Sequence, residues 1–494
     1  MGDVVARPFP PGDYDVVVVG TGPGGLQTSY SLTRAGVASH ALLSQDDGPG
    51  GMFRRFPIFE RLISWTKPDA PVARDTRDYE WYDHNSLVAE EPAARGIAPT
   101  FMDRSFDVPA RAEMEAALVA FAERTGVAAR YGCRWEATRR DGDRIVLETT
   151  DGEYRCRAAV FALGMTEPWS PALEGAELAT HYVETRPASA YANKRVVIIG
   201  KRNSGFELAY GLLPWARELV LVSPRPVDIS VLAHSPLRVR YLQPYEEYVR
   251  GGAGNLVVDA AIVRIERAAD GLRVLADGTR WDGRFEFGAD EVVLATGFKV
   301  PLRDLRELGV TTVVNDRVPA LTSFWESISV PGIFFAGNTT VGSRGLRKHG
   351  LAPTSTSVNG FRYNARVLAR HLAERLGIEQ ERRQRVLDVP PVVVPAEGER
   401  RMRVELVLGD VAVLAHVQRR VELRRWRHLD RRRDRVPPAA AVQEVLERED
   451  ALVADPVRLV EREHPGEVAL LDPQLRRARE LAQQQRDDVC LAEP

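Results

Sequence analysis

Residues 14–25 read YDVVVVGTGPGG, a β-branched run followed directly by glycines. The apolar residues Leu26, Tyr30 and Leu32 then recur with a helical period. This order predicts a buried strand, a tight turn and a helix. Such a turn brings the backbone close to a pyrophosphate, and the amides at the helix start favour its negative charge. The predicted dinucleotide contacts are Gly20, Thr21, Gly22, Pro23, Gly24 and Gly25.

A second stretch, KRVVIIGKRNSG at 194–205, repeats this order, with Arg202 where the middle glycine is expected. The Arg202 guanidinium either binds a pyrophosphate or is solvated at the surface, and both interpretations stay open. The next strand, 218–222, precedes Ser223 and Arg225, and no acid follows it to bind an adenosine ribose. This pattern favours NADPH over NADH. The predicted contacts of this unit are Gly200, Arg202, Asn203, Ser204, Gly205, Ser223, Arg225 and Gly297.

The rest of the chain predicts a nested organisation. Alternating residues and Asp-Gly turns in 135–163 and in 261–287 predict two small antiparallel meanders. The apolar stripe of 358–376 follows the 3.6-residue period, so this helix is expected to complete the first unit. The predicted fold class is α/β, with two nested Rossmann-like dinucleotide-binding domains, small antiparallel β-meanders and a C-terminal appendage. The predicted boundaries are 1–165 and 298–378 for the first domain, 166–297 for the second and 379–494 for the appendage.

Composition narrows the functional class. The 494 residues are 44% hydrophobic with a formal net charge of −2, which is ordinary for a globular protein. The three cysteines form no CxxC pair, which favours a reducing, cytoplasmic location and argues against thiolate metal clusters. A signal peptide and an apolar run of about 18 residues are both absent from the sequence, so no membrane span is expected. The Arg-rich stretch 419–435 contains only one aromatic residue, Trp426, and therefore does not predict nucleic-acid binding; solvation or a subunit contact is favoured, and a homo-oligomer stays open.

Residues 13–378 resemble the two-dinucleotide-domain flavoproteins. The motifs that carry this resemblance are VVVVGTGPGG, GGMFRRFP, RLISWTKP, YDHNSL, GKRNSG, VVLATGF and FFAGN. The stretch is similar to the flavin-containing monooxygenases and, more closely, to the FAD-dependent oxidoreductase domain-containing proteins. The resemblance implies that FAD and NADPH are the cofactors, and that a small molecule and molecular oxygen are the substrates.

The same resemblance identifies further FAD contacts. Ser44 follows the second strand of the first unit, where an acid usually binds the ribose, and a serine hydroxyl can still form that hydrogen bond. Gly337 and Asn338 stand where these flavoproteins often have Gly-Asp, and Asn338 can still bond a ribityl hydroxyl. The predicted FAD contacts outside the first loop are Ser44, Gly50, Gly51, Gly337 and Asn338.

Four residues are candidates for the catalytic centre. Thr66 stands where the flavin-containing monooxygenases place an asparagine, and Asn85 or Lys67 would supply a compensating donor. His349 is expected either to touch the flavin or to end a loop. The linker lacks the spacing typical of Baeyer–Villiger enzymes, because six positions separate Gly175 from His181.

A second resemblance, to thioredoxin-reductase-like proteins proposed to reduce bacillithiol disulfides, implies a different reaction. Those relatives carry a cysteine in the first glycine-rich loop, where this chain has Gly24. Disulfide reduction needs a thiolate at the flavin, whereas Cys133 and Cys156 are expected to be small buried residues. The sequence therefore predicts an FAD- and NADPH-dependent oxidoreductase, with oxygen transfer to nitrogen or sulfur favoured. An NADPH-dependent flavin or disulfide reductase and a non-catalytic flavin-bound interaction protein remain as alternatives.

Overall fold

The computed structural model describes residues 7–55, 61–62, 64–225, 254–280, 282–342 and 357–378. The chain divides into two compact units, residues 1–382 and 383–494. The second unit, and with it the appendage predicted at 379–494, lies outside the described residues. So does His349.

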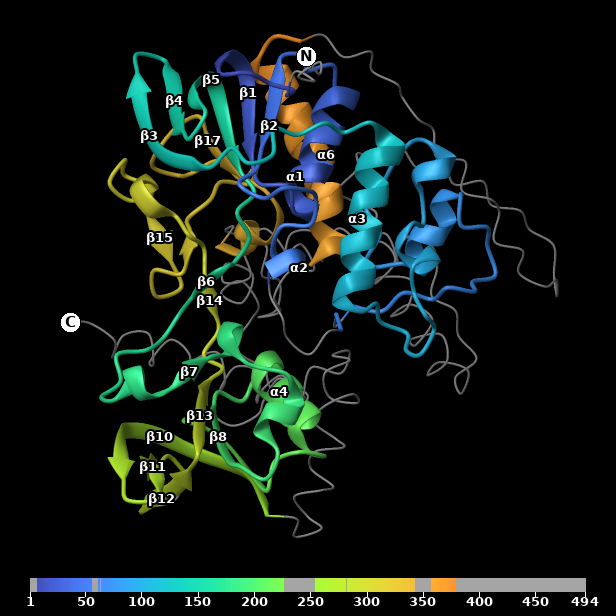
Figure 1. Cartoon of the computed structure of the whole chain (residues 1–494). Helices are drawn as coiled ribbons and strands as arrows, with labels where there is room; N and C mark the ends of the chain where they lie inside the picture. Colours follow the sequence, from blue (N-terminus) through green and yellow to red (C-terminus); the bar gives the residue numbers. More distant parts are fainter. Residues whose placement is uncertain are drawn as a thin grey trace, which may run out of the picture. The chain divides into compact units, whose positions relative to one another are not determined.

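The first sheet of the larger unit has six strands in the order β2-β1-β5-β4-β3, with β17 beside β5 (Figure 1). Strands β1, β2, β5 and β17 are parallel, and β3 and β4 form an antiparallel extension. Val16, Val17 and Val18 of β1 are wholly buried because parallel strands are covered on both faces. The strands are β1 Gly12–Val19, β2 His40–Leu43, β3 Trp135–Asp141, β4 Arg144–Thr149, β5 Gly152–Phe161 and β17 Ile333–Phe335.

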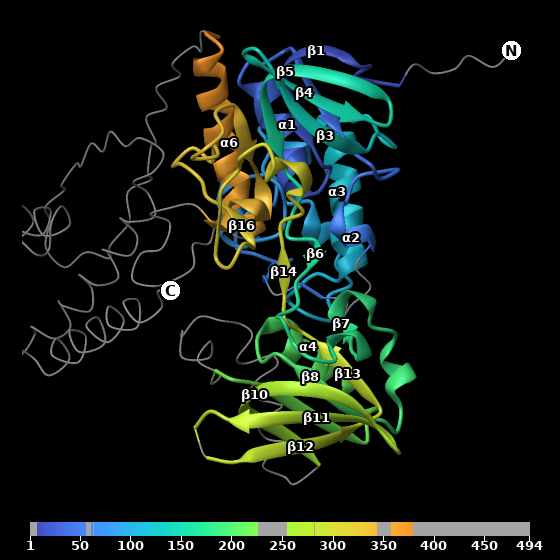
Figure 2. The ribbon, with the colours of Figure 1, turned by 90° about the vertical axis from the view of Figure 1, so that its left-hand side faces the viewer.

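Helices cover this sheet. The described α-helices are α1 Pro23–Arg34, α2 Met52–Arg55, α3 Arg111–Thr125, α4 Asn203–Leu212 and α6 Val358–Arg375. Helix α6 packs against α1, although they are far apart in the sequence (Figure 2). Its predicted stripe is buried at Val358, Phe361, Ala365, Leu368 and Leu372. Short 3₁₀ helices lie at Arg77–Trp81, Pro92–Ala94, Ala98–Thr100, Ala176–Leu178, Tyr182–Glu184, Ala188–Tyr191, Arg303–Leu305 and Gly337–Gly342.

The second sheet has seven strands in the order β12-β11-β10-β9-β8-β13-β7. Its central strands are parallel, and β10, β11 and β12 form the antiparallel meander that the sequence predicts. The strands are β7 Thr180–His181, β8 Arg195–Ile199, β9 Glu218–Ser223, β10 Asn255–Ala268, β11 Gly271–Gly278, β12 Arg284–Ala289 and β13 Glu291–Leu294.

The chain passes between the two sheets twice. The outgoing strand β6 (Glu167–Pro168) pairs antiparallel with the returning strand β14 (Phe298–Lys299). A further small ladder joins β15 (Thr312–Val313) to β16 (Val318–Pro319) before β17 returns to the first sheet. The second sheet is therefore an insertion within the first, and the predicted nested α/β fold is confirmed.

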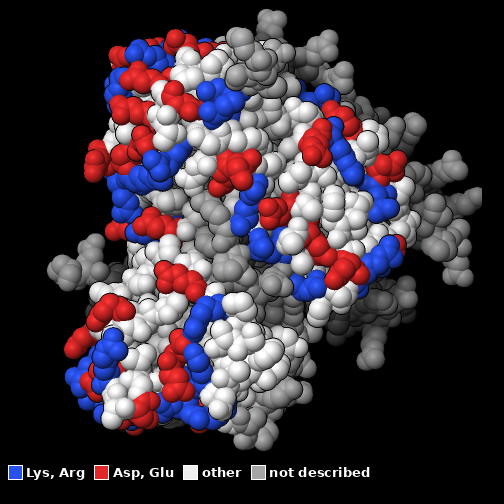
Figure 3. Space-filling view, in the orientation of Figure 1, with Lys and Arg blue, Asp and Glu red and all other residues white. Residues whose placement is uncertain are grey.

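The charged side chains are intermixed on the face shown in Figure 3, where Lys and Arg alternate with Asp and Glu. This agrees with a formal net charge of only −2. Within the described residues, no helix is both long enough and apolar enough to cross a bilayer.

Candidate functional site

The first glycine-rich loop has a geometry that only glycine allows. A Cβ on Gly20 would lie 2.6 Å from the carbonyl oxygen of Ala162, and a Cβ on Gly25 would lie 1.7 Å from the carbonyl oxygen of Gly20. Gly22 differs, because a Cβ there would meet nothing within 4 Å. The loop is thus packed tightly on the sheet and open at Gly22, which is the arrangement that a pyrophosphate requires.

Gly24 contacts Gly337, which lies far along the chain in the turn after β17. A Cβ on Gly24 would lie 2.6 Å from the Cα of Gly337, which itself has a φ of +70°. The turn after β17 therefore approaches the start of α1 at backbone contact, and no side chain fits at Gly24. Asn338 follows in this turn and is half-buried. Gly51 has a φ of +56° and packs in the same way against Gly22.

Ser44 follows β2 directly and is buried, while the next two residues line a groove. Its hydroxyl oxygen accepts a hydrogen bond from Thr21 Oγ1 at 2.8 Å and one from the Asp46 amide at 3.2 Å. Both contacts use the Ser44 oxygen as the acceptor, so neither of them uses the hydroxyl proton. Gly50, with a φ of +130°, donates its amide to the Thr21 carbonyl at 3.0 Å. The groove has a volume of about 440 Å³ and is lined by Gln45, Asp46, Gly132, Arg134 and Thr150.

The second loop repeats the first. A Cβ on Gly200 would lie 2.4 Å from the Ala295 carbonyl oxygen, and one on Gly205 would lie 1.9 Å from the Gly200 carbonyl oxygen. Arg202 is the exposed N-cap of α4, whose first turn contains Asn203 and Ser204 and has no acidic residue. The helix start can therefore attract an anion, and the guanidinium adds a positive charge beside it.

No acid follows β9 directly, as the sequence predicts, but an acidic residue of the neighbouring strand β10 lies beside its end. Asp259 of β10 is the register partner of Ser223. Its carboxylate forms an ion pair with the buried Lys201 and a second one with Arg280, at 3.3 Å. Burial lowers the pKa of Lys201, and the charge of Asp259 partly offsets this shift. Sequence reasoning missed Asp259 because the pairing joins strands across a long connection.

Thr66 and Asn85 come together around a buried carboxylate that the sequence analysis did not identify. Thr66 Oγ1 donates to Asp83 Oδ1 at 2.7 Å, and Asn85 Nδ2 donates to Thr66 Oγ1 at 3.0 Å. The amides of Asn85 and Ser86 also donate to Asp83 Oδ1, each at 3.0 Å. Thr66, Asp83 and Asn85 are at most 1% exposed. Lys67, in contrast, is exposed and lies outside this cluster.

The amide of Asn85 has a defined orientation. Its Nδ2 donates to the Ser64 carbonyl at 2.8 Å as well as to Thr66, so the nitrogen must face these acceptors. Asn85 Oδ1 and Asp83 Oδ2 are buried, and neither has a hydrogen-bond partner among the described residues. The three side chains thus hold segments 64–67 and 83–86 together, and their remaining polar atoms are acceptors.

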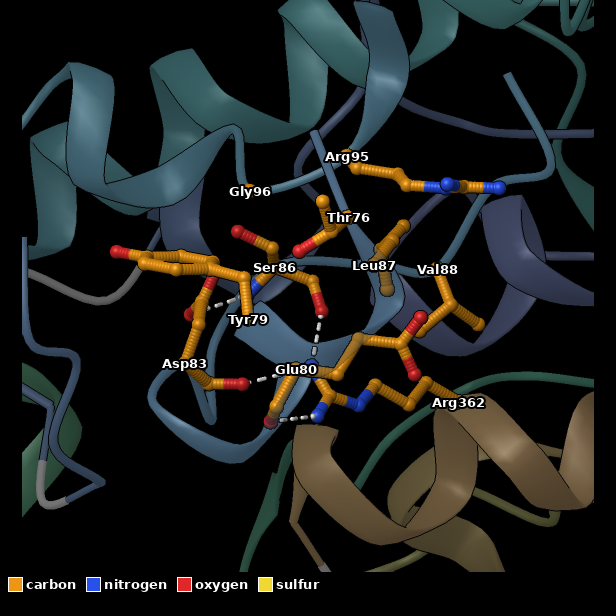
Figure 4. Close-up of a pocket in the computed structure, with 10 residues that line it drawn as sticks. All are labelled: Thr76, Tyr79, Glu80, Asp83, Ser86, Leu87, Val88, Arg95, Gly96 and Arg362. Atoms are coloured by element: carbon orange, nitrogen blue, oxygen red, sulfur yellow. Dashed lines mark hydrogen bonds between the residues drawn. The ribbon is translucent and has the colours of Figure 1, made fainter. Parts of the chain in front are cut away.

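Arg362 of α6 clamps segment 80–86 from the other side (Figure 4). Its guanidinium is 2% exposed and donates to the carbonyls of Asp83, Ser86 and Glu80 at 2.9, 2.7 and 3.1 Å. A cavity of about 10 Å³ lies between them, which is about the room that one water molecule needs. The clamp positions the loop that carries Asp83 and Asn85.

Gly297 lies where the chain leaves the second sheet. It has a φ of +94°, and a Cβ there would lie 2.6 Å from Nη2 of Arg317. Its carbonyl accepts a hydrogen bond from the Trp169 amide at 3.0 Å. The Arg317 side chain could move aside, so the requirement for glycine at 297 comes from this positive φ, and cofactor contact at this position stays a prediction.

Neither described thiol is suited to redox chemistry. Cys133 and Cys156 are buried and unpaired. Burial raises the pKa of both, that of Cys156 to about 12. A thiolate is the reactive form, so both are expected to be inert. Among the residues that the structure describes, no cluster of His, Cys, Asp or Glu could hold a metal ion.

Residues 17–337 match the family described as pyridine nucleotide-disulphide oxidoreductase. The chain therefore belongs to this family, whose FAD- and NADPH-binding fold agrees with the two loops described above. The predicted resemblance and the predicted cofactor pair are confirmed at this level.

The curated relatives include FAD-dependent oxidoreductase domain-containing protein 2. The zebrafish (Danio rerio) protein is 29% identical over 45% of this chain, and the mouse (Mus musculus) protein is 25% identical over 73%. The matches cover only 32% and 58% of those relatives' own lengths. A ferredoxin–NADP reductase of Salinispora arenicola is 29% identical over 70% of this chain and 93% of the relative.

Two solved structures illustrate the breadth of the fold. Bacillithiol disulfide reductase of Staphylococcus aureus is 15% identical, with a TM-score of 0.56 over 74% of this chain and 99% of that chain. A flavin-containing monooxygenase of Stenotrophomonas maltophilia is 22% identical, with a TM-score of 0.53 over 74% and 99%. At these identities the likeness shows the fold alone, and the reaction must be inferred from the site.

Proposed function

We propose that this protein is an FAD- and NADPH-dependent monooxygenase that transfers one oxygen atom to a nitrogen or sulfur of a small organic molecule. The reaction consumes NADPH, one proton and O₂, and it releases NADP⁺, water and the oxygenated product. Residues 1–165 and 298–378 would bind FAD, and residues 166–297 would bind NADPH.

The contact between Gly24 and Gly337 is the observation that carries this choice. Disulfide reduction needs a thiolate beside the flavin, and the glycine-rich loop has no room for a cysteine Cβ at Gly24. Cys133 and Cys156 are buried in the first domain and have raised pKa values. Oxygen transfer needs no protein thiol, so it agrees with the described residues better than disulfide reduction does.

The chain's own residues would bind and orient the cofactor. FAD supplies the electron transfer and the activation of oxygen when it is bound. The open side of Gly22 and the first turn of α1 would hold its pyrophosphate, Ser44 would donate to its ribose, and Asn338 would bond its ribityl chain.

The buried cluster of Thr66, Asp83 and Asn85 would have a positioning role. Asp83 accepts a hydrogen bond from the Thr66 hydroxyl, and Asn85 donates a hydrogen bond to the same hydroxyl. This network would fix the loops beside the flavin and keep water out, which oxygen transfer requires. Lys67 and His349 remain further candidates for contact with the substrate or flavin.

The test uses the FAD-loaded full chain, NADPH and ¹⁸O₂, with methyl phenyl sulfide and N,N-dimethylbenzylamine as probes. We expect one ¹⁸O atom in each sulfoxide or N-oxide formed and one NADPH consumed per product. Recovery of all the consumed oxygen as hydrogen peroxide with both probes would refute oxygen transfer. Protein that stays colourless after FAD reconstitution would refute every flavin-dependent function.

A second candidate is an NADPH-dependent reductase that passes electrons to an external acceptor. The match to a ferredoxin–NADP reductase over 93% of that relative's length favours it. It predicts rapid anaerobic NADPH oxidation with ferricyanide or free flavin as the acceptor, and no labelled product under ¹⁸O₂. The two candidates are thus separated by the same set of assays.

The remaining assignments are also proposals. A cytoplasmic location agrees with the low cysteine content. A small molecule and O₂ are the proposed partners, and nucleic acid is not among them.

A further inference from the structure

The adenosine end of the second nucleotide site contains a carboxylate that is already engaged. Asp259 of β10 is the register partner of Ser223, so it lies next to the end of β9, where the acidic residue of a dinucleotide-binding fold accepts hydrogen bonds from ribose hydroxyls. A free carboxylate at this place would favour NADH and would repel the 2′-phosphate of NADPH.

Both oxygens of Asp259 face cations. Oδ1 forms an ion pair with Nζ of Lys201, whose side chain is only 2% exposed, and the same Nζ donates to the Val258 carbonyl at 2.8 Å. Oδ2 lies 3.3 Å from Nε of Arg280. A carboxylate held in this way is neutralised and poorly placed to bind ribose hydroxyls.

Arg280 is held at this site by its neighbour. Thr279 Oγ1 donates to the Pro224 carbonyl at 2.7 Å and to the Asp259 carbonyl at 3.1 Å. The Thr279 amide donates to the same Asp259 carbonyl, also at 3.1 Å. The end of β11 is thereby tied to the segment that follows β9, so Arg280 and Arg225 lie in adjoining backbone segments.

The charge and exposure of Arg225 and Arg280 suit a phosphate. Arg225 is exposed, and Arg280 is 58% exposed. Arg280 turns Nε toward Asp259, and its two terminal nitrogens have no partner among the described residues. Lys201, Arg225 and Arg280 together outnumber the single carboxylate of Asp259, which leaves a positive excess. A planar guanidinium with free terminal nitrogens can bind a phosphate through two hydrogen bonds.

We propose that Arg280 is a specificity-determining residue that binds the 2′-phosphate of NADPH together with Arg225. The inference rests on the proposed use of NADPH. It adds Arg280, which follows β11, to Arg225, which follows β9. The ion pair of Lys201 with Asp259 neutralises the carboxylate that would otherwise repel the phosphate.

The test measures binding to the FAD-loaded full chain by calorimetry, with 2′,5′-ADP and 5′-AMP as probes that differ only in the 2′-phosphate. We expect Arg280→Ala to weaken 2′,5′-ADP binding about tenfold and to change 5′-AMP binding less than twofold. Arg280→Lys should weaken 2′,5′-ADP binding by an intermediate amount, because lysine keeps the positive charge but lacks the paired donors of the planar guanidinium.

Arg284→Ala is the matched control. Arg284 begins β12, is 65% exposed and pairs with Asp277 at 3.0 Å instead of Asp259, so the variant removes the same charge from the same meander without touching the Asp259 ion pairs. It should leave the binding of both probes unchanged. Arg280→Ala binding 2′,5′-ADP as tightly as the wild type, or losing both probes equally, would overturn the assignment of Arg280.

The outcome for the wild type separates this inference from the proposed function. Equal affinity of the wild type for the two probes would overturn the use of NADPH itself. Clear preference of the wild type for 2′,5′-ADP, retained in Arg280→Ala, would overturn only the role of Arg280. Failure to oxygenate a substrate would leave both binding results unaffected.

Discussion

Single atoms decide what the first glycine-rich loop tolerates. Gly22 and Gly24 are two positions apart, yet a Cβ has open space at the first and lies 2.6 Å from the Gly337 Cα at the second. The dinucleotide-binding pattern specifies Gly22 but leaves position 24 free, so it does not explain why Gly24 is a glycine. The structure separates those needed for packing from the one that leaves room for a ligand.

This difference predicts opposite behaviour of two similar variants. Gly24→Ala should destabilise the fold by about 1–3 kcal/mol, because the backbone at Gly337 must move. Gly22→Ala should keep its thermal stability, since Gly22 has an ordinary φ of −71°, but should bind FAD more weakly. Thermal unfolding and FAD content measured by absorbance distinguish the two effects. Equal stability of both apoproteins would contradict the packing argument.

The hydroxyl of Thr66 provides a second test at this scale. Thr66→Val keeps the shape of the side chain but leaves Asn85 Nδ2 without one acceptor and Asp83 without one donor. A buried group left unsatisfied costs about 1–3 kcal/mol, so urea unfolding should show a loss of that size. Thr66→Ser, which retains the hydroxyl, is the control and should recover most of the stability. A loss of similar size in both variants would show that the hydrogen bonds are not the cause.

At the scale of elements, α6 both packs on α1 through its apolar stripe and binds segment 80–86 through Arg362. The stripe places α6 against α1 and is readable from sequence because it follows the helical period. Arg362 stands next to Phe361 in that stripe and would be read as a surface residue. Its three carbonyl partners lie about 280 positions earlier in the chain, a separation that no local pattern can indicate.

The clamp can be tested by removing its donors. Arg362→Met should leave carbonyls of residues 80, 83 and 86 unsatisfied and lower the free energy of unfolding by about 3 kcal/mol or more. Arg375→Ala on the same helix is the control, because Arg375 makes a half-exposed ion pair with Glu326, and such pairs contribute less than about 1 kcal/mol. Faster hydrogen exchange in segment 80–86 of the Met variant would locate the effect. Protection of that segment equal to the wild type would refute the clamp.

In the sheets, too, features encoded by contiguous residues are predicted from the sequence, whereas pairings between distant strands are not. Strand–turn–helix units at 14–34 and 194–212 are predicted correctly, since each is encoded by contiguous residues. The position of Asp259 beside Ser223 follows from a parallel pairing over a long connection. Sequence alone therefore identifies the two glycine-rich turns, but not the ion-paired Asp259 beside the end of β9.

For the whole molecule, buried and half-buried histidines with lowered pKa values make stability depend on pH. His40 lies between Ser29 Oγ at 3.0 Å and the Val37 carbonyl at 2.8 Å, and burial lowers its pKa. Burial likewise lowers the pKa of His84, His181 and His371. The unfolded chain takes up protons near pH 6.5, as unperturbed histidine does, whereas the folded chain resists them.

The stabilisation from these groups is therefore complete above pH 6.5 and is lost as the pH falls toward their lowered pKa values. Urea unfolding at pH 7.5 and 5.5 should show lower stability at the acidic value. His40→Gln, which cannot titrate, should reduce this difference. A wild type that is equally stable at both pH values, or a His40→Gln variant with an unchanged difference, would contradict the prediction.

The ladder between β6 and β14 gives the molecule a modular character. Because Pro168 and Phe298 are direct cross-strand partners, the inserted NADP-type unit starts and finishes at neighbouring backbone positions, about 5 Å apart for an antiparallel pair. With respect to the first sheet, the whole insertion is therefore connected in the same way as one long hairpin loop. Such a connection allows the inserted unit to be exchanged for that of a relative, with a different nucleotide preference, while the register of the surrounding sheet is kept.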